Sequence, residues 1–187
     1  MDGRAVSNPD SVPPPIDDGA ADHLKPGLKL PPVVLPATGG SEVCLAALPG
    51  RSVVVVYPWT GRPGHPNPPD WDLIPGAHGS TPELEGFRDL SDAFAKNGVR
   101  IFGLSRQTTA YQSEMAGRLG LPFPILSDAE GAFAAALALP SFLTGGEIYL
   151  KRFTLLVRDG SIERVTYPVL NPERQADELE AWLQLHR

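Results

Sequence analysis

The chain has a single cysteine, Cys44, among its 187 residues. One cysteine excludes an internal disulfide, a Cys-x-x-Cys redox pair and a zinc site built from several cysteines. Long apolar runs are also missing. The longest, residues 132–139, has eight residues, whereas a membrane-spanning helix needs about 18 or more. We therefore expect no membrane segment.

Basic clusters are absent as well. The chain carries 16 Lys and Arg against 22 Asp and Glu, for a formal charge of −6. Because nucleic-acid binding depends on Lys and Arg neutralising phosphates, this balance argues against such a partner. The N-terminus lacks the apolar stretch of a signal peptide. We expect a cytoplasmic protein, and a lone thiol suits that reducing compartment.

Glycine and proline are abundant, at 19 and 21 residues. Residues 1–25 combine prolines and acidic residues with few large apolar side chains, which predicts a disordered tail. Residues 26–187 then form one domain. Residues 58–79 hold six prolines and four glycines, too many for a helix or a central strand. Trp59 and Trp71 lie in this insertion, so we expect it to pack down as an ordered flap.

Hydrophobic periodicity predicts an α/β protein. The run Ser52–Tyr57 is β-branched and apolar on both faces, as a central buried strand requires. Ser80 or Thr81 is expected to cap a helix, with Glu83 completing a capping box. Alternating strands and helices predict a central mixed sheet with helices on both faces. The expected strands are 33–35, 42–45, 52–57, 99–104, 123–126, 153–157 and 162–167, and the expected helices are 80–97, 109–119, 129–139 and 172–186.

Five segments together resemble a known family: SVVVVYP, GSTPELEGFRD, VRIFGLS, LGLPFPILSD and RFTLLVRDGSIERV. They are similar to the peroxiredoxins, above all to the peroxiredoxin Q or bacterioferritin-comigratory branch of the alkyl hydroperoxide reductase/thiol-specific antioxidant superfamily. The similarity runs from about residue 31 to residue 185. It implies a thioredoxin-like fold and a lineage of thiol-dependent peroxide reductases.

The resemblance also places the family's catalytic positions. In that branch the active helix opens with Gly-Cys-Thr, and a resolving cysteine follows five residues later. Ser80 falls on the first cysteine and Glu85 on the second, with Thr81 beside Ser80. Arg152 matches the arginine that holds the thiolate and the peroxide. Without either cysteine, the chain is expected to lack normal peroxidase activity.

Other positions are expected around this site. Pro58 matches the proline that ends the strand leading to the active loop, and Thr60 is a spatial substitute for the family's threonine, whose position falls on Ala77. We further expect Arg62, His78 and Arg88 to contribute to binding.

Two explanations of Ser80 remain open at this point. The serine is either an engineered replacement that freezes a thiol enzyme or the natural residue of a scaffold with another purpose. In the second case Ser80, Thr81 and Arg152 are expected to form a pocket for a small anion, or the scaffold serves a partner or a non-redox reaction.

Cys44 is expected to be a packing residue. The four histidines are scattered, so we expect no metal site and no cofactor. The expected partners are a peroxide or small anion and a thiol reductant, and the expected state is a monomer or homodimer.

Overall fold

The computed structural model describes residues 12–186, and every structural statement below concerns this part of the chain. Its centre is a five-stranded sheet with the order β5-β4-β3-β8-β9. Two short two-stranded sheets, β1-β2 and β6-β7, flank it. The elements are β1 (Val34–Pro36), β2 (Glu42–Cys44), η2 (Leu45–Ala47), β3 (Arg51–Val56), η3 (Trp71–Leu73), α1 (Ser80–Asp89), α2 (Ser91–Lys96), β4 (Val99–Ser105), α3 (Thr109–Leu119), β5 (Ile125–Ser127), α4 (Ala132–Leu137), β6 (Ser141–Thr144), β7 (Glu147–Leu150), β8 (Phe153–Arg158), β9 (Ser161–Thr166), η4 (Pro172–Arg174) and α5 (Gln175–Leu185).

The central sheet is mixed, as the sequence predicts. Strand β3 pairs in parallel with β4 and antiparallel with β8. On the outer sides, β4 pairs in parallel with β5, and β8 pairs antiparallel with β9. The four valines Val53–Val56 of β3 are fully buried. Complete burial of consecutive residues requires cover on both faces, because neighbouring side chains point to opposite sides of a strand.

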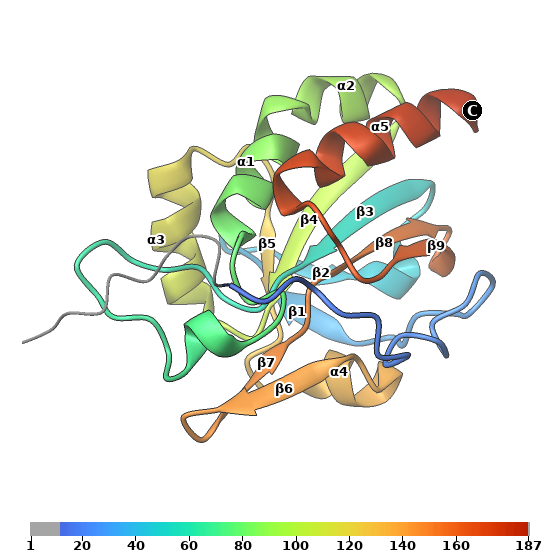
Figure 1. Ribbon diagram of the computed structural model, residues 1–187. Coiled ribbons are helices and arrows are strands. Elements are labelled where there is room, and N and C mark those ends of the chain that lie inside the picture. Colours follow the sequence, from blue (N-terminus) through green and yellow to red (C-terminus); the bar gives the residue numbers. More distant parts are fainter. Residues whose placement is uncertain (1–11, 187) are drawn as a thin grey trace, which may run out of the picture.

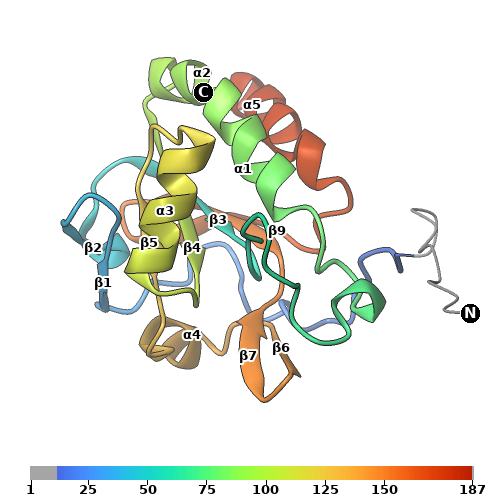
Figure 2. The same cartoon turned by 90° about the vertical axis from the view of Figure 1, so that its left-hand side faces the viewer.

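Helices cover both faces of this sheet, which confirms the second part of the prediction (Figures 1 and 2). On one face, Val53 and Val55 pack with Phe87 of α1 and Met115 of α3. Helices α2 and α5 complete this layer. On the other face, Val54 and Val56 pack with α4 and with the segment before β1.

The start of α1 differs from the prediction. Gly79, not Ser80 or Thr81, is the N-cap, and no side chain caps the helix. Gly79 has φ 106°, and a Cβ at this position would lie 2.8 Å from Cγ of Pro172. Glycine is therefore required, and Ser80 becomes the first helical residue. The expected helix over residues 80–97 also divides into α1 and α2 at Leu90.

The hairpin β6-β7 is absent from the sequence-based prediction. It pairs Ser141–Thr144 with Glu147–Leu150 across Gly145 and Gly146, which both have positive φ. A pair of glycines between two short β-prone segments is the signal that would have located it.

The prediction of a disordered tail is wrong for residues 12–25. Ala21 and Leu24 are buried in the core, and Nε2 of His23 lies 2.8 Å from the carbonyl oxygen of Leu137. Apolar contacts made over a long sequence separation hold this segment, and composition alone does not reveal them. The remainder of that prediction, residues 1–11, lies outside the described residues.

The flap packs against the domain, as expected from its tryptophans. Trp71 is buried, and its ring lies 5.8 Å from that of Phe142 in β6 and 5.2 Å from that of Tyr149 in β7. In the part of the chain that the structure describes, no helix is both long enough and apolar enough to cross a membrane.

Candidate functional site

The structure brings Ser80 and Arg152 together. Ser80 opens α1, and Arg152 lies in the two-residue connection between β7 and β8. Nη2 of Arg152 donates to Oγ of Ser80 at 3.0 Å. Both residues are buried, with 3% and 4% of their surface exposed. A guanidinium thus lies against the first residue of a ten-residue helix, beneath the surface of the protein.

The same guanidinium organises the chain that leads into α1. Nη2 of Arg152 also donates to the carbonyl oxygens of His78 at 3.1 Å and Ala77 at 3.4 Å. These carbonyls belong to the last residues of the flap. Arg152 therefore fixes the end of the flap and the start of α1 with one nitrogen.

Glu83 is the site residue that sequence reasoning missed. Its carboxylate pairs with Nη1 of Arg152, and the residue is completely buried. Burial raises the pKa of Glu83 to about 7, against the opposing effect of Arg152. Glu83 is one helical turn beyond Ser80, so the sequence contained a signal: the two side chains lie on the same face of a helix. The sequence-based prediction instead interprets Glu83 as part of a capping box.

Thr60 does not join Ser80. Its hydroxyl donates to Oε1 of Gln107 at 3.1 Å, and its carbonyl oxygen accepts from the Tyr111 hydroxyl at 2.9 Å. Pro58, two residues before Thr60 and two residues past the end of β3, is buried. The insertion therefore turns Thr60 toward α3.

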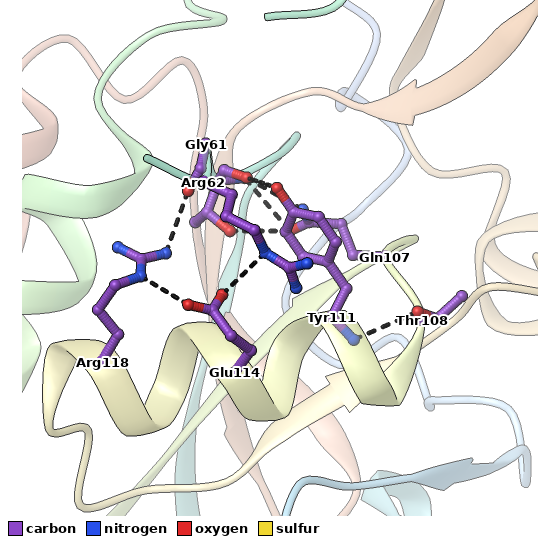
Figure 3. A network of polar contacts seen from close by, with 8 residues as sticks. Gly61, Arg62, Gln107, Thr108, Tyr111, Glu114 and Arg118 are labelled. Carbon is purple, nitrogen blue, oxygen red and sulfur yellow. Dashed lines mark hydrogen bonds and ion pairs between the residues drawn. The ribbon is translucent and has the colours of Figure 1, made fainter. Parts of the chain in front are cut away.

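Arg62 also belongs to the α3 side of the flap (Figure 3). Its Nε lies 3.2 Å from Glu114, and its guanidinium lies 4.4 Å from the centre of the Tyr111 ring. Arg118 joins the same network through Glu114 at 2.9 Å and the carbonyl oxygen of Gly61 at 3.2 Å. Arg62 thus anchors the flap to α3, and its side chain makes these contacts rather than contacts with Ser80.

Of the remaining expected residues, His78 and Thr81 border the centre, whereas Arg88 makes its contacts elsewhere. His78 contributes its carbonyl oxygen to Arg152, while its imidazole lies 2.7 Å from Asp72. Arg88 donates to Asp89 and to the carbonyl oxygen of Leu119, both at 2.8 Å. Thr81 is half-buried next to Ser80.

Cys44 lies in β2, in the small β1-β2 sheet, opposite Val34. It is half-buried and free. Among residues 12–186, no group of three or more His, Cys, Asp or Glu side chains is arranged to hold a metal ion.

Arg152 also lines a cavity of about 220 Å³. Pro15, Ile16 and Asp18 of the N-terminal segment form part of its wall. Asp18 pairs with Lys151 and accepts from the Tyr167 hydroxyl at 2.5 Å. These two hydrogen bonds hold the pKa of Asp18 well below its ordinary value.

The comparisons with known proteins identify the family of the chain and its fold. The model of the Redoxin family matches residues 25–183. The chain belongs to the Redoxin family. Within the family, the chain falls in the peroxiredoxin Q/bacterioferritin-comigratory branch that its sequence resembles.

Individual relatives support this placement. The chloroplastic peroxiredoxin Q of Gentiana triflora is 26% identical over 184 residues, covering 96% of this chain and 77% of the relative. The crystal structure of peroxidoxin BcpB from Mycobacterium tuberculosis superposes with a TM-score of 0.72 at 26% identity, covering 88% of this chain and 99% of that one. The structure of peroxiredoxin Q of Xanthomonas campestris superposes with a TM-score of 0.69 at 25% identity, covering 86% of this chain and 98% of that one. The fold is thus the thioredoxin-like α/β fold that the resemblance implies.

Proposed function

We propose that this redoxin carries Ser80 in the place of the peroxidatic cysteine and therefore lacks the thiol peroxidase activity of its lineage. The observation that carries the proposal is the 3.0 Å contact between Oγ of Ser80 and Nη2 of Arg152 at the start of α1. A helix N-terminus and an arginine are the two features that stabilise a thiolate. Here they surround a hydroxyl.

The chemistry explains the loss. A peroxidatic thiolate attacks one oxygen of the peroxide, becomes a sulfenic acid and releases the other oxygen as water or an alcohol. A serine hydroxyl stays protonated near neutral pH and has no comparable reversible oxidation. Glu85, at the expected resolving position, is on the surface of α1 beside Arg88. The one thiol, Cys44, lies in a different sheet from the strands that support this centre.

The second candidate, a small anion bound by Ser80, Thr81 and Arg152, has less support. Both terminal nitrogens of Arg152 already have protein acceptors, one of them the Glu83 carboxylate. An anion that binds these two nitrogens must displace Ser80 or Glu83, and both Ser80 and Arg152 are almost completely buried. The expected thiol reductant, the cytoplasmic location and the monomeric or homodimeric state remain predictions.

The test is an assay of hydrogen peroxide consumption with dithiothreitol as the reductant. We expect the wild-type protein to match the rate of the same concentration of free cysteine, and Cys44→Ser to remove the remaining thiol contribution. Turnover by the wild type well above free cysteine would contradict the proposal.

A gain of function probes the position itself. We expect Ser80→Cys to yield a thiol that forms a sulfenic acid, trapped by dimedone and seen by mass spectrometry, faster than a thiol at an ordinary surface. Ser113→Cys, on the exposed side of α3, is the matched control. If both thiols oxidise at the same rate, Ser80 does not occupy the peroxidatic position.

A further inference from the structure

A second cavity lies at the carboxyl ends of the parallel strands β3 and β4. It measures about 230 Å³. It is bounded by the start of the flap, the segment after β4 and the β6-β7 hairpin, and neither Ser80 nor Arg152 lines it. Crevices beyond the carboxyl ends of parallel strands are the usual ligand sites of open α/β sheets. The residues used below are Trp59, Arg106, Thr108, Tyr111, Glu147 and Tyr149.

We propose that this cavity binds a planar aromatic monocarboxylate. The site is distinct from the Ser80–Arg152 centre, so the proposal does not depend on the loss of peroxidase activity. Three observations carry it: fixed aromatic walls, a cation without an acidic partner, and a single acidic side chain at the rim.

The walls are aromatic rings that hold one another in place. Trp59 and Tyr149 both pack edge-on against Trp71, with ring centres 5.5 Å and 5.2 Å apart. Trp59 also lies 6.4 Å from the Tyr111 ring, and Tyr149 stacks on Phe142 at 5.6 Å. Rings fixed by such contacts form a preorganised surface for a flat ligand.

Arg106 supplies the charge. Its Nη2 donates to the carbonyl oxygen of Ala129 at 3.2 Å, whereas its Nε is buried and has no hydrogen-bond partner. Among residues 12–186, no carboxylate lies within ion-pair distance of this guanidinium. Asp128, next to Ala129, uses both carboxylate oxygens on the backbone of α4, at Phe133 and Ala134. Partly buried charges are normally paired, so Arg106 is an available partner for a carboxylate.

The surroundings favour a single negative charge. Thr108 is the N-cap of the eleven-residue helix α3, whose positive dipole end therefore lies at the cavity. Glu147 lies exposed at the rim and repels negative charge, so it disfavours a ligand with two negative charges more than a ligand with one. A carboxylate with one charge suits this balance better than a phosphate with two.

Isothermal titration calorimetry with benzoate tests the proposal, using the full-length protein. Benzamide, with the same ring and no charge, and cyclohexanecarboxylate, with the charge and no flat ring, are the matched ligands. We expect benzoate to bind more tightly than either, because only benzoate uses both the rings and Arg106. No detectable benzoate binding at millimolar concentration would overturn the proposal, and so would equal affinity for the three ligands.

Two variants locate the site. Arg106→Gln is expected to weaken benzoate binding on the order of tenfold, the effect of losing one charge-assisted contact. Arg174→Gln, an equal loss of charge at an exposed position in η4, is expected to leave it unchanged. Circular dichroism melting of both variants serves to check that they fold. If Ser80→Ala weakens binding and Arg106→Gln does not, benzoate binds at Arg152 and the proposal is wrong.

Discussion

Glu83 offers the sharpest physical test of the buried centre, through the substitution Glu83→Gln. The glutamine keeps the shape of the side chain and removes the titrating proton. In the folded protein, burial raises the pKa of Glu83 from 4.5 to about 7. The folded state therefore binds this proton more tightly than the unfolded state does. Wild-type stability should fall as the pH rises from about 4.5 to about 7, where the carboxyl must ionise inside the protein.

The magnitude follows from the same two pKa values. Each pKa unit is worth about 1.4 kcal/mol, so ionising Glu83 in place costs the wild type about 3 kcal/mol. The Gln variant does not pay this cost. We expect the stability advantage of the wild type over Glu83→Gln to shrink by about 3 kcal/mol between pH 4.5 and pH 8.

Urea unfolding followed by circular dichroism at several pH values measures this difference. Glu85→Gln is the control, because it makes the same chemical change two residues later at a partly exposed position. An advantage that grows with pH would refute the reasoning. It would mean that the attraction of Arg152 outweighs burial and lowers the pKa of Glu83.

Two further substitutions test the segments around this centre. Gly79→Ala should destabilise the protein by about 1–3 kcal/mol, because alanine disfavours the positive φ and its Cβ would meet Pro172 at 2.8 Å. Gly117→Ala, in open space on α3, should be neutral or stabilising in the same urea unfolding experiment. Asp18→Asn should increase hydrogen–deuterium exchange in residues 15–24, whereas Asp17→Asn should not. Equal exchange in the two variants would contradict the role of the Asp18 contacts with Lys151 and Tyr167 in fixing this segment. Because the pKa of Asp18 is lowered on folding, the wild-type contact should stabilise the protein near neutral pH and be lost on acidification.

Local sequence patterns predicted the sheet well. The valine run of β3 has to be buried on both sides, and this places it in the middle of a covered sheet. The proximity of Ser80 and Arg152 followed from the family resemblance, because 72 residues separate them in the chain. Local spacing carries no information about such a contact.

The missed features have physical reasons. Glu83 fits a capping box as well as a buried ion pair. The structure decides between them, because Gly79 is the N-cap and Glu83 pairs with Arg152. Thr60 was expected near Ser80, but its hydroxyl contacts Gln107, in the segment between β4 and α3. Leu24 lies among prolines and charged residues. The composition of this segment predicts disorder, even though long-range contacts bury Leu24.

The N-terminal wall of the Arg152 cavity has a practical consequence when the activities of redoxins are compared. The family model begins at residue 25, yet Pro15, Ile16 and Asp18 form one wall of that cavity. A protein trimmed to the shared domain would lack this wall, and we expect Arg152 to be more accessible in it than in the intact chain. Activities measured on such a fragment would describe a more open molecule. Access to the buried arginine thus depends on residues 15–18, which precede the part of the chain that the family model matches.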